Sequence, residues 1–239
     1  MINQFVMPWL RRLLSTMVVL AVFLSGCDAA SNQQTESTRP QTNQNSEIMI
    51  GNLPQLKGQA TVELTVKGSP IAIELNGDMA PVTAGNFLDL VQRGFYDGLT
   101  FHRVVKEPQP FVVQGGDPKG NGTGGFVNPE TGQRRSIPLE IVPKGEEEPI
   151  YGKTLEQAGV EKEPALKHKR GSLSMARSQM PNSASSQFFI ALAELPFLDG
   201  DYAVFGEVTK GMDAVDQIQQ GDRIESAKVV SGGDNLQKS

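Results

Sequence analysis

The chain has 239 residues, of which 38% are apolar and 21% are charged, a balance typical of one globular domain with appended segments. Its formal net charge is −5, whereas a nucleic-acid-binding protein normally carries a basic excess gathered into a patch, so the composition argues against nucleic acid as a partner. Two histidines and one cysteine, Cys27, supply few ligands for a metal site, and we expect neither a metal nor another cofactor.

Residues 1–26 have the parts of a bacterial lipoprotein signal peptide. A pair of arginines precedes an uncharged apolar run at 13–24, which is too short for a bilayer span of about 20 residues. The tetrapeptide that follows, Leu-Ser-Gly-Cys at 24–27, resembles the lipobox, in which the cysteine is lipidated and becomes the mature N-terminus. The alternative is an uncleaved anchor helix with an incidental cysteine. The order of the parts favours an extracytoplasmic protein anchored through Cys27 to a bacterial membrane, on the periplasmic side.

Residues 27–56 form a polar segment rich in Ser, Thr, Gln and Asn. Such a segment cannot bury enough apolar surface to offset the entropy lost on ordering, so we expect a flexible tether. The remaining residues, 57–239, then form a single folded domain.

The folded domain is predicted to begin with a hairpin and a helix. Residues 60–66 and 71–75 alternate apolar and polar side chains, as half-buried strands do, and Gly68-Ser69-Pro70 between them predicts a turn. Pro81 suits the first turn of a helix, and Gly94 suits the position just after its end.

Short strands dominate the rest of the chain. A second helix is predicted at 212–220, and a short helix near 154–158 lies within a charged excursion. Runs of strand-forming residues separated by Gly and Pro predict strands at 100–105, 111–115, 171–176, 187–191, 203–208 and 227–231. This pattern indicates a mainly β fold, an antiparallel barrel or sandwich with a helix over each open end.

Three blocks of the domain resemble the cyclophilin family of peptidyl-prolyl cis-trans isomerases. They are GFYDGLTFHRVV at 94–105, FVVQGGDPKGNGTGG at 111–125, and the motifs GSLSMAR, SSQFFI, FLDG and VFG within 171–206. The resemblance implies a closed eight-stranded antiparallel β-barrel capped by two α-helices, with an apolar groove on its outer face. It also implies a monomeric isomerase, without a cofactor, whose partners are proline-containing polypeptides. With the signal peptide, it implies a role in the folding of extracytoplasmic proteins.

By position, Arg103 matches the family's catalytic arginine, and Gln114 is expected to hold the substrate carbonyl or to orient Arg103. The barrier to rotation about a peptide bond is about 18–20 kcal/mol. A permanently charged donor near the prolyl nitrogen stabilises the twisted amide better than the planar one. The resemblance implies that the substrate-binding positions are Phe111, Val112, Gly122, Ala176, Arg177, Gln187, Phe189, Phe197, Leu198 and Tyr202.

The chain departs from the family pattern at several positions. Phe197 stands where many members carry tryptophan, Tyr202 where many carry histidine, and Arg177 where asparagine is common. The connection 106–110 is longer than usual, and residues 126–170 are expected to form surface excursions of unknown role.

Other interpretations of these residues are open. Arg103 alone could be an ordinary solvated arginine, and Phe188 and Phe205 are expected in the core. His102 has no partnered nucleophile in a recognisable motif, so it is expected to be structural. The competing functions are a binding module that holds proline-containing segments without turnover and a purely structural lipoprotein.

Overall fold

The computed structural model describes residues 50–238, so the predicted signal peptide, Cys27 and most of the predicted tether lie outside the described residues. Within 50–238, no helix has the length and apolar character needed to cross a bilayer. The short strand β1 (Gln55–Leu56) pairs with β12 (Leu236–Gln237), and Leu56 is fully buried. The fold therefore includes residues that precede the expected domain start at 57.

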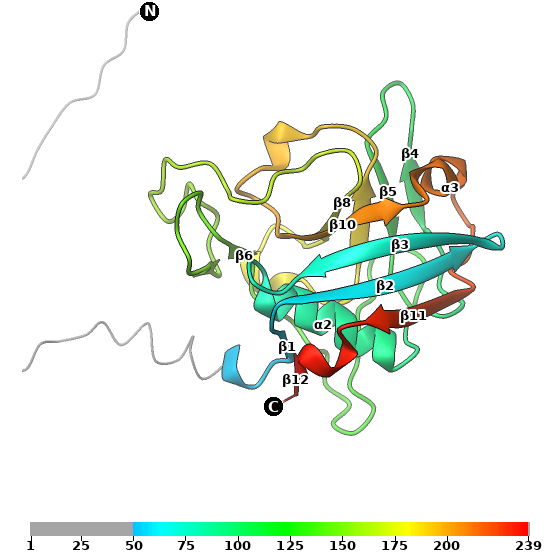
Figure 1. Ribbon diagram of the computed structural model, residues 1–239, viewed down its shortest axis with the longest axis horizontal. Coiled ribbons are helices and arrows are strands. Elements are labelled where there is room, and N and C mark those ends of the chain that lie inside the picture. Colours follow the sequence, from blue (N-terminus) through cyan, green and yellow to red (C-terminus); the bar gives the residue numbers. More distant parts are fainter. Residues whose placement is uncertain (1–49, 239) are drawn as a thin grey trace, which may run out of the picture. The chain divides into compact units, whose positions relative to one another are not determined.

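Eight antiparallel strands form one curled sheet (Figure 1) in the order β11-β2-β3-β10-β8-β9-β5-β4. The predicted hairpin forms, since β2 (Gln59–Val66) and β3 (Ser69–Asn76) pair in continuous register and bury alternate side chains. The mainly β architecture is confirmed. The other strands of the sheet are β4 (Arg103–Val105), β5 (Val112–Gly115), β8 (Ser172–Met175), β9 (Phe188–Ala191), β10 (Val204–Lys210) and β11 (Ser226–Ser231).

The outer strands of this sheet, β4 and β11, do not pair with each other, so the expected closed barrel is wrong and the sheet is a curled half-barrel. β4 has 3 residues, and all three pair with β5. The loops that precede the two strands meet instead, because the Ile224 N–H donates to the Leu99 carbonyl over 2.8 Å. Thr100 and Arg223 add an isolated β-bridge, so loop backbone rather than a strand ladder holds the seam.

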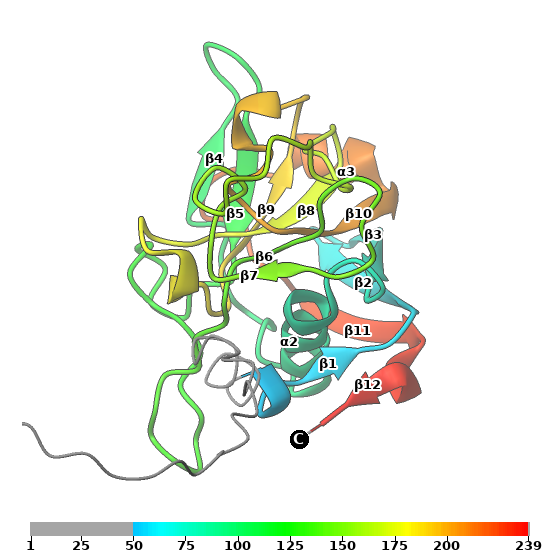
Figure 2. The same ribbon diagram turned by 90° about the vertical axis from the view of Figure 1, so that its left-hand side faces the viewer.

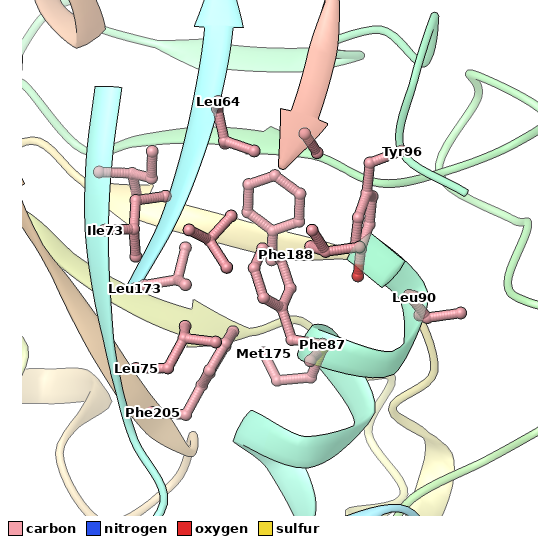
Figure 3. Packing of buried hydrophobic residues seen from close by; sticks show 14 of the residues in the cluster. Leu64, Ile73, Leu75, Phe87, Leu90, Tyr96, Leu173, Met175, Phe188 and Phe205 are labelled. Carbon is pink, nitrogen blue, oxygen red and sulfur yellow. The ribbon is translucent and has the colours of Figure 1, made fainter. Parts of the chain in front are cut away.

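Helix α2 (Pro81–Gln92) has the predicted start and end and packs against the inner face of the sheet. The ring of Phe87 meets the ring of Phe188 edge to face, with centroids 5.3 Å apart, and lies equally close to Phe205 (Figure 3). Phe188 and Phe205 are fully buried, which confirms that both belong to the core.

Two predicted helical segments differ from the structure. α3 (Met212–Gln217) ends before the predicted residue 220, because Ile218 has an extended ψ of 132°. The helix expected near 154–158 is a single turn, closed by a 3.0 Å hydrogen bond from the Ala158 N–H to the Thr154 carbonyl. Short helices gain little from their few backbone bonds, so helical periodicity alone does not extend them.

Residues 126–170, expected as surface excursions, are partly anchored in the fold. β6 (Glu140–Ile141) pairs with β7 (Ile150–Tyr151) in a small separate sheet. Leu139, Ile141 and Leu155 form a buried apolar cluster with Ala203 from the end of the chain segment before β10.

The same excursion supplies acceptors for the first turn of α2, and Figure 2 shows its strands β6 and β7 beside this helix. The buried Glu140 carboxylate accepts hydrogen bonds from the Val82 N–H (3.0 Å) and the Thr83 N–H (2.7 Å). α2 has no capping side chain of its own at Ala80. Since the first N–H groups of a helix have no partner within it, Glu140 satisfies two of them and places a carboxylate at the positive end of the helix.

Candidate active site

Arg103 and Gln114 form a cross-strand pair at the edge of the sheet. The register of β4 and β5 sets them opposite each other, and the Arg103 Nη1 donates to Gln114 Oε1 over 3.2 Å. The guanidinium carbon lies 5.3 Å from the centre of the Phe111 ring. Arg103 is exposed, so its remaining N–H groups can reach a ligand that lies on Phe111.

A chain of side-chain amides continues from this pair. Gln114 Nε2 donates to Gln187 Oε1 over 3.1 Å. Gln187 Nε2 donates in turn to the carbonyls of Gly122 (3.0 Å) and Gly124 (2.9 Å). Because a backbone carbonyl can only accept, these two bonds fix which end of each amide points toward Arg103.

A buried carboxylate organises the glycine-rich loop that provides these carbonyls. Asp117 is 1% exposed and accepts hydrogen bonds from the N–H groups of Lys119 (2.8 Å), Asn121 (3.0 Å) and Gly122. Burial raises the pKa of Asp117, but the backbone donors lower it by more, so its pKa lies below the ordinary value. Gly122 has a φ of 87°, a conformation that glycine adopts without strain.

Side chains of β5 and β9 alternate between the two faces of the sheet. Val113 and Phe188 face the main core, whereas Val112 and Phe189 face the other way. The second set builds a separate outer cluster that includes most of the predicted substrate-binding residues. Its members are the buried Val112, Phe189, Ala191 and Leu195 and the half-buried Phe111, Ala176, Ala193, Leu198 and Tyr202.

Aromatic rings form the exposed side of the outer cluster. Phe111 stacks on Phe197 with centroids 5.9 Å apart, and Phe189 meets Tyr202 edge to face at 6.0 Å. Phe197 is 66% exposed, although phenylalanine side chains are most often buried. Exposed apolar surface of this kind beside one cation is suited to binding a small apolar ring next to a polarisable amide.

Arg177 has fewer free N–H donors for a ligand than its charge implies, because several already bond to the protein. Its Nε donates to the Asp201 carbonyl (2.9 Å), and its Nη1 donates to the carbonyls of Ser178 (2.8 Å) and Gln179. Its guanidinium carbon lies 4.6 Å from the centre of the Tyr202 ring. The side chain therefore joins two loops beside the outer cluster and supports Tyr202.

A cavity of about 470 Å³ opens next to Gln114 and Gln187. Its lining contains two arginines, Arg134 and Arg177, and no carboxylate. The other lining residues are small or uncharged: Gly122, Thr123, Gly124, Ser136, Ala176, Ser178, Met180, Asn182, Ser183 and Ser185.

Three residues near the outer cluster were not predicted from the sequence. His168 lies behind the cluster with its ring parallel to that of Phe189, at 6.0 Å and 12°. Leu195 is buried in the cluster, and Asp199 is hydrogen-bonded to His168. His168 stands in a basic run, Lys-His-Lys-Arg, which has no apolar periodicity that would place it in the interior.

Comparison with known proteins places these residues in a family context. Residues 61–236 match the model of the family described as cyclophilin type peptidyl-prolyl cis-trans isomerase/CLD. A Synechocystis protein provisionally named a thylakoid lumen peptidyl-prolyl cis-trans isomerase is 49% identical over 197 residues, which are 78% of this chain and 51% of that protein. A chloroplastic peptidyl-prolyl cis-trans isomerase of Arabidopsis thaliana is 45% identical over 203 residues, 77% of this chain and 45% of that protein. The chain thus spans about half the length of these two relatives.

A shorter relative and solved structures match over most of their length. The peptidyl-prolyl cis-trans isomerase of Helicobacter pylori is 40% identical over 169 residues, 70% of this chain and 83% of that protein. The crystal structure of a Cryptosporidium parvum cyclophilin type peptidyl-prolyl cis-trans isomerase is similar with a TM-score of 0.57 and 28% identity, covering 72% of this chain and 98% of that one. A second structure of that protein, in the presence of the dipeptide Ala-Pro, gives a TM-score of 0.55, 29% identity, and coverage of 72% and 99%.

Proposed function

The chain belongs to the cyclophilin type peptidyl-prolyl cis-trans isomerase family, and we propose that it is itself an isomerase of X–Pro bonds in other polypeptides. One observation carries the proposal: an exposed guanidinium stands beside an exposed apolar surface. The guanidinium carbon of Arg103 lies 5.3 Å from the centre of the Phe111 ring. The reaction needs both features, and it breaks no covalent bond.

The chemistry follows from the electronic structure of the amide. Uncatalysed X–Pro exchange takes roughly 10–100 s at 25 °C. When the bond twists, the prolyl nitrogen loses its resonance with the carbonyl and regains a lone pair. A hydrogen bond from Arg103 to that lone pair is strong only in the twisted state, so it stabilises the transition state more than either ground state. Arginine keeps its proton at any relevant pH.

The outer cluster has a different role, because it binds the substrate in all its states. We propose that the pyrrolidine ring lies against Phe111, Phe189 and Leu198, which exclude water from it. Gln114 has its oxygen occupied by Arg103 and its nitrogen by Gln187. This supports the second of its two expected roles, the orientation of Arg103.

The cavity next to Gln114 is a suitable place for substrate residues that flank the proline. Two arginines and no carboxylate line it, although the chain as a whole carries a net charge of −5. Arg177 donates hydrogen bonds to backbone carbonyls, whereas Arg134 is exposed and has no ion-pair partner among the described residues. We propose that clients with an acidic side chain near the proline are preferred.

The location of the protein is part of the same proposal. We propose that the mature chain is a monomer, tethered by the polar residues between Cys27 and the folded domain and lipid-anchored at Cys27 on the periplasmic side of a bacterial membrane. The names of the lumenal and chloroplastic relatives are consistent with a protein that functions outside the cytoplasm. Labelling cells with an alkyne fatty acid tests the anchor: the wild-type chain should incorporate the label, and Cys27→Ser should not. Equal labelling of both would exclude Cys27 as the lipidated residue.

Turnover of an Ala-Pro peptide tests the function. The full chain, purified in detergent, is compared with Arg103→Ala and with a matched control, Lys228→Ala, which removes an exposed cation on β11. We expect wild type and control to accelerate isomerisation equally and Arg103→Ala to lose most of the acceleration. Peptide binding without acceleration by wild type would identify a binding module instead. A chain that neither binds nor isomerises would be a structural lipoprotein.

A further inference from the structure

Phe197 and Leu198, which we call the wall of the outer cluster, stand on a turn that has little stability of its own. The 3₁₀ turn η2 (Pro196–Leu198) presents Phe197 and Leu198, and none of its residues is buried. Such turns have poor hydrogen-bond geometry and are short. If Phe197 and Leu198 are to meet a substrate in a fixed place, something outside the turn must hold it.

A single residue, His168, is bonded to both ends of this turn. Its carbonyl accepts a hydrogen bond from the N–H of Leu195, the residue before the turn, over 2.9 Å. Its own N–H donates to Oδ1 of Asp199, the residue after the turn, over 2.8 Å. Its ring Nδ1 lies 2.8 Å from the same oxygen. Three contacts from one residue therefore bracket the turn.

The ring of His168 is also part of the support behind the cluster. It is 2% exposed and lies parallel to the Phe189 ring, which forms the floor of the outer cluster. Because a carboxylate only accepts, Nδ1 carries the proton and Nε2 does not. Burial lowers the pKa of His168 more than Asp199 raises it, so the ring is neutral at neutral pH.

We infer that His168 and Asp199 form a positioning pair, which holds the wall carried by η2 against the floor formed by Phe189 and thereby sets substrate affinity. This inference rests on the proposed function, because it concerns the same site. The His168 side chain is 1% exposed and the Asp199 side chain 14%, so the pair acts mainly through Phe197, Leu198 and Phe189. The His168 ring stacks on Phe189 of β9, whereas Arg103 stands on β4, and β5 lies between these two strands.

The separation of wall and guanidinium predicts a specific kinetic signature. Wall contacts bind planar and twisted substrate alike, so loosening the wall raises KM and leaves kcat nearly unchanged. Loss of Arg103 has the opposite effect. A general loss of stability would instead lower the active fraction, which lowers apparent kcat and leaves KM unchanged.

Two pairs of variants test the inference in the full chain. His168→Phe keeps a stacked ring and removes the Nδ1 donor, while His168→Asn keeps an N–H donor near that place. Asp199→Ala removes the shared acceptor, while Asp199→Asn keeps one oxygen there. We expect KM for an Ala-Pro peptide to rise about five- to tenfold in His168→Phe and Asp199→Ala. In each conservative variant it should rise less than threefold, with kcat within twofold throughout.

The control is Asp89→Asn on α2, which weakens the bonds from Arg93 and Arg135 to a buried carboxylate that is not part of the outer cluster. It should lower the melting temperature without raising KM. The inference is overturned if His168→Phe leaves KM within twofold of wild type, if kcat falls instead, or if Asp89→Asn raises KM equally. Titration of the same peptide by NMR gives Kd without requiring turnover. If wild type binds but does not isomerise, a raised Kd in His168→Phe still supports the pair while the proposed function fails.

Discussion

The substitution Gln114→Glu tests whether the direction of the amide chain matters for Arg103. In the wild type, Arg103 donates to Gln114, Gln114 donates to Gln187, and Gln187 donates to two carbonyls of the glycine-rich loop. A glutamate side chain at this position has no N–H donor. Its second oxygen then faces Gln187 Oε1, an acceptor, at the 3.1 Å that the donor now occupies.

Rotation of the Gln187 amide cannot repair this conflict. It would turn Nε2 toward the new carboxylate but would also turn Oε1 toward the carbonyls of Gly122 and Gly124, which only accept. One or two polar contacts therefore remain unmade, at about 1–3 kcal/mol for each. If only one such loss is transmitted to the placement of the guanidinium in the transition state, kcat/KM falls roughly 5- to 150-fold. The new carboxylate also draws the guanidinium toward itself and away from a substrate.

The assay compares kcat/KM for an Ala-Pro peptide among wild type, Gln114→Met and Gln114→Glu. Methionine has a similar volume and makes no hydrogen bond, so it leaves partners unpaired without repelling them. The expected order of activity is wild type, then Gln114→Met, then Gln114→Glu. A Gln114→Glu variant that is as active as wild type, or more active than Gln114→Met, would refute the argument from donor direction.

Three further predictions concern other parts of the fold. Glu140→Ala leaves two buried N–H groups of α2 without an acceptor and should lower the unfolding free energy by about 2–4 kcal/mol, measured in urea, with kcat/KM of the folded fraction unchanged; a loss under about 0.5 kcal/mol would contradict the capping role. Because the pKa of Asp117 is lowered in the fold, its stabilising effect is complete above the unfolded pKa of about 3.9 and is lost as pH falls through the folded pKa. Asp117→Asn should therefore flatten the acid limb of the stability curve, and an unchanged limb would assign it to other groups. Peptides with Glu within three residues of the proline should be turned over faster than their Gln counterparts, by a margin that shrinks in Arg134→Gln and at high salt; an equal margin in Arg134→Gln would exclude that arginine as the selecting group.

The sequence predicts those features that depend on local pattern. The alternation in β2 and β3 and the proline and glycine that bound α2 are local signals, and the corresponding elements form as predicted. The same period of two separates Phe188, which faces the core, from Phe189, which faces the outer cluster. Family resemblance indicates the substrate-binding positions, and six of them lie together in the outer cluster.

Features that depend on distant partners could not be predicted in this way. Glu140 is buried because it meets the start of α2, more than fifty residues earlier, and nothing around it in the sequence indicates that contact. The hydrogen bond between His168 and Asp199 likewise joins residues that are far apart in the sequence. The open seam between β4 and β11 also depends on distant partners, since the Ile224 N–H donates there to the Leu99 carbonyl.

The rotation rate of a bound peptide tests the central claim most directly, because it separates the reaction from binding. Exchange NMR on an Ala-Pro peptide saturated with the enzyme reports how fast the bound cis and trans forms interconvert. We predict that Arg103→Ala slows this interconversion by about 100-fold or more, the loss typical for one preorganised donor, while Kd changes less than threefold. Bound forms that interconvert equally fast with and without the guanidinium would show that the outer cluster alone is responsible for any acceleration.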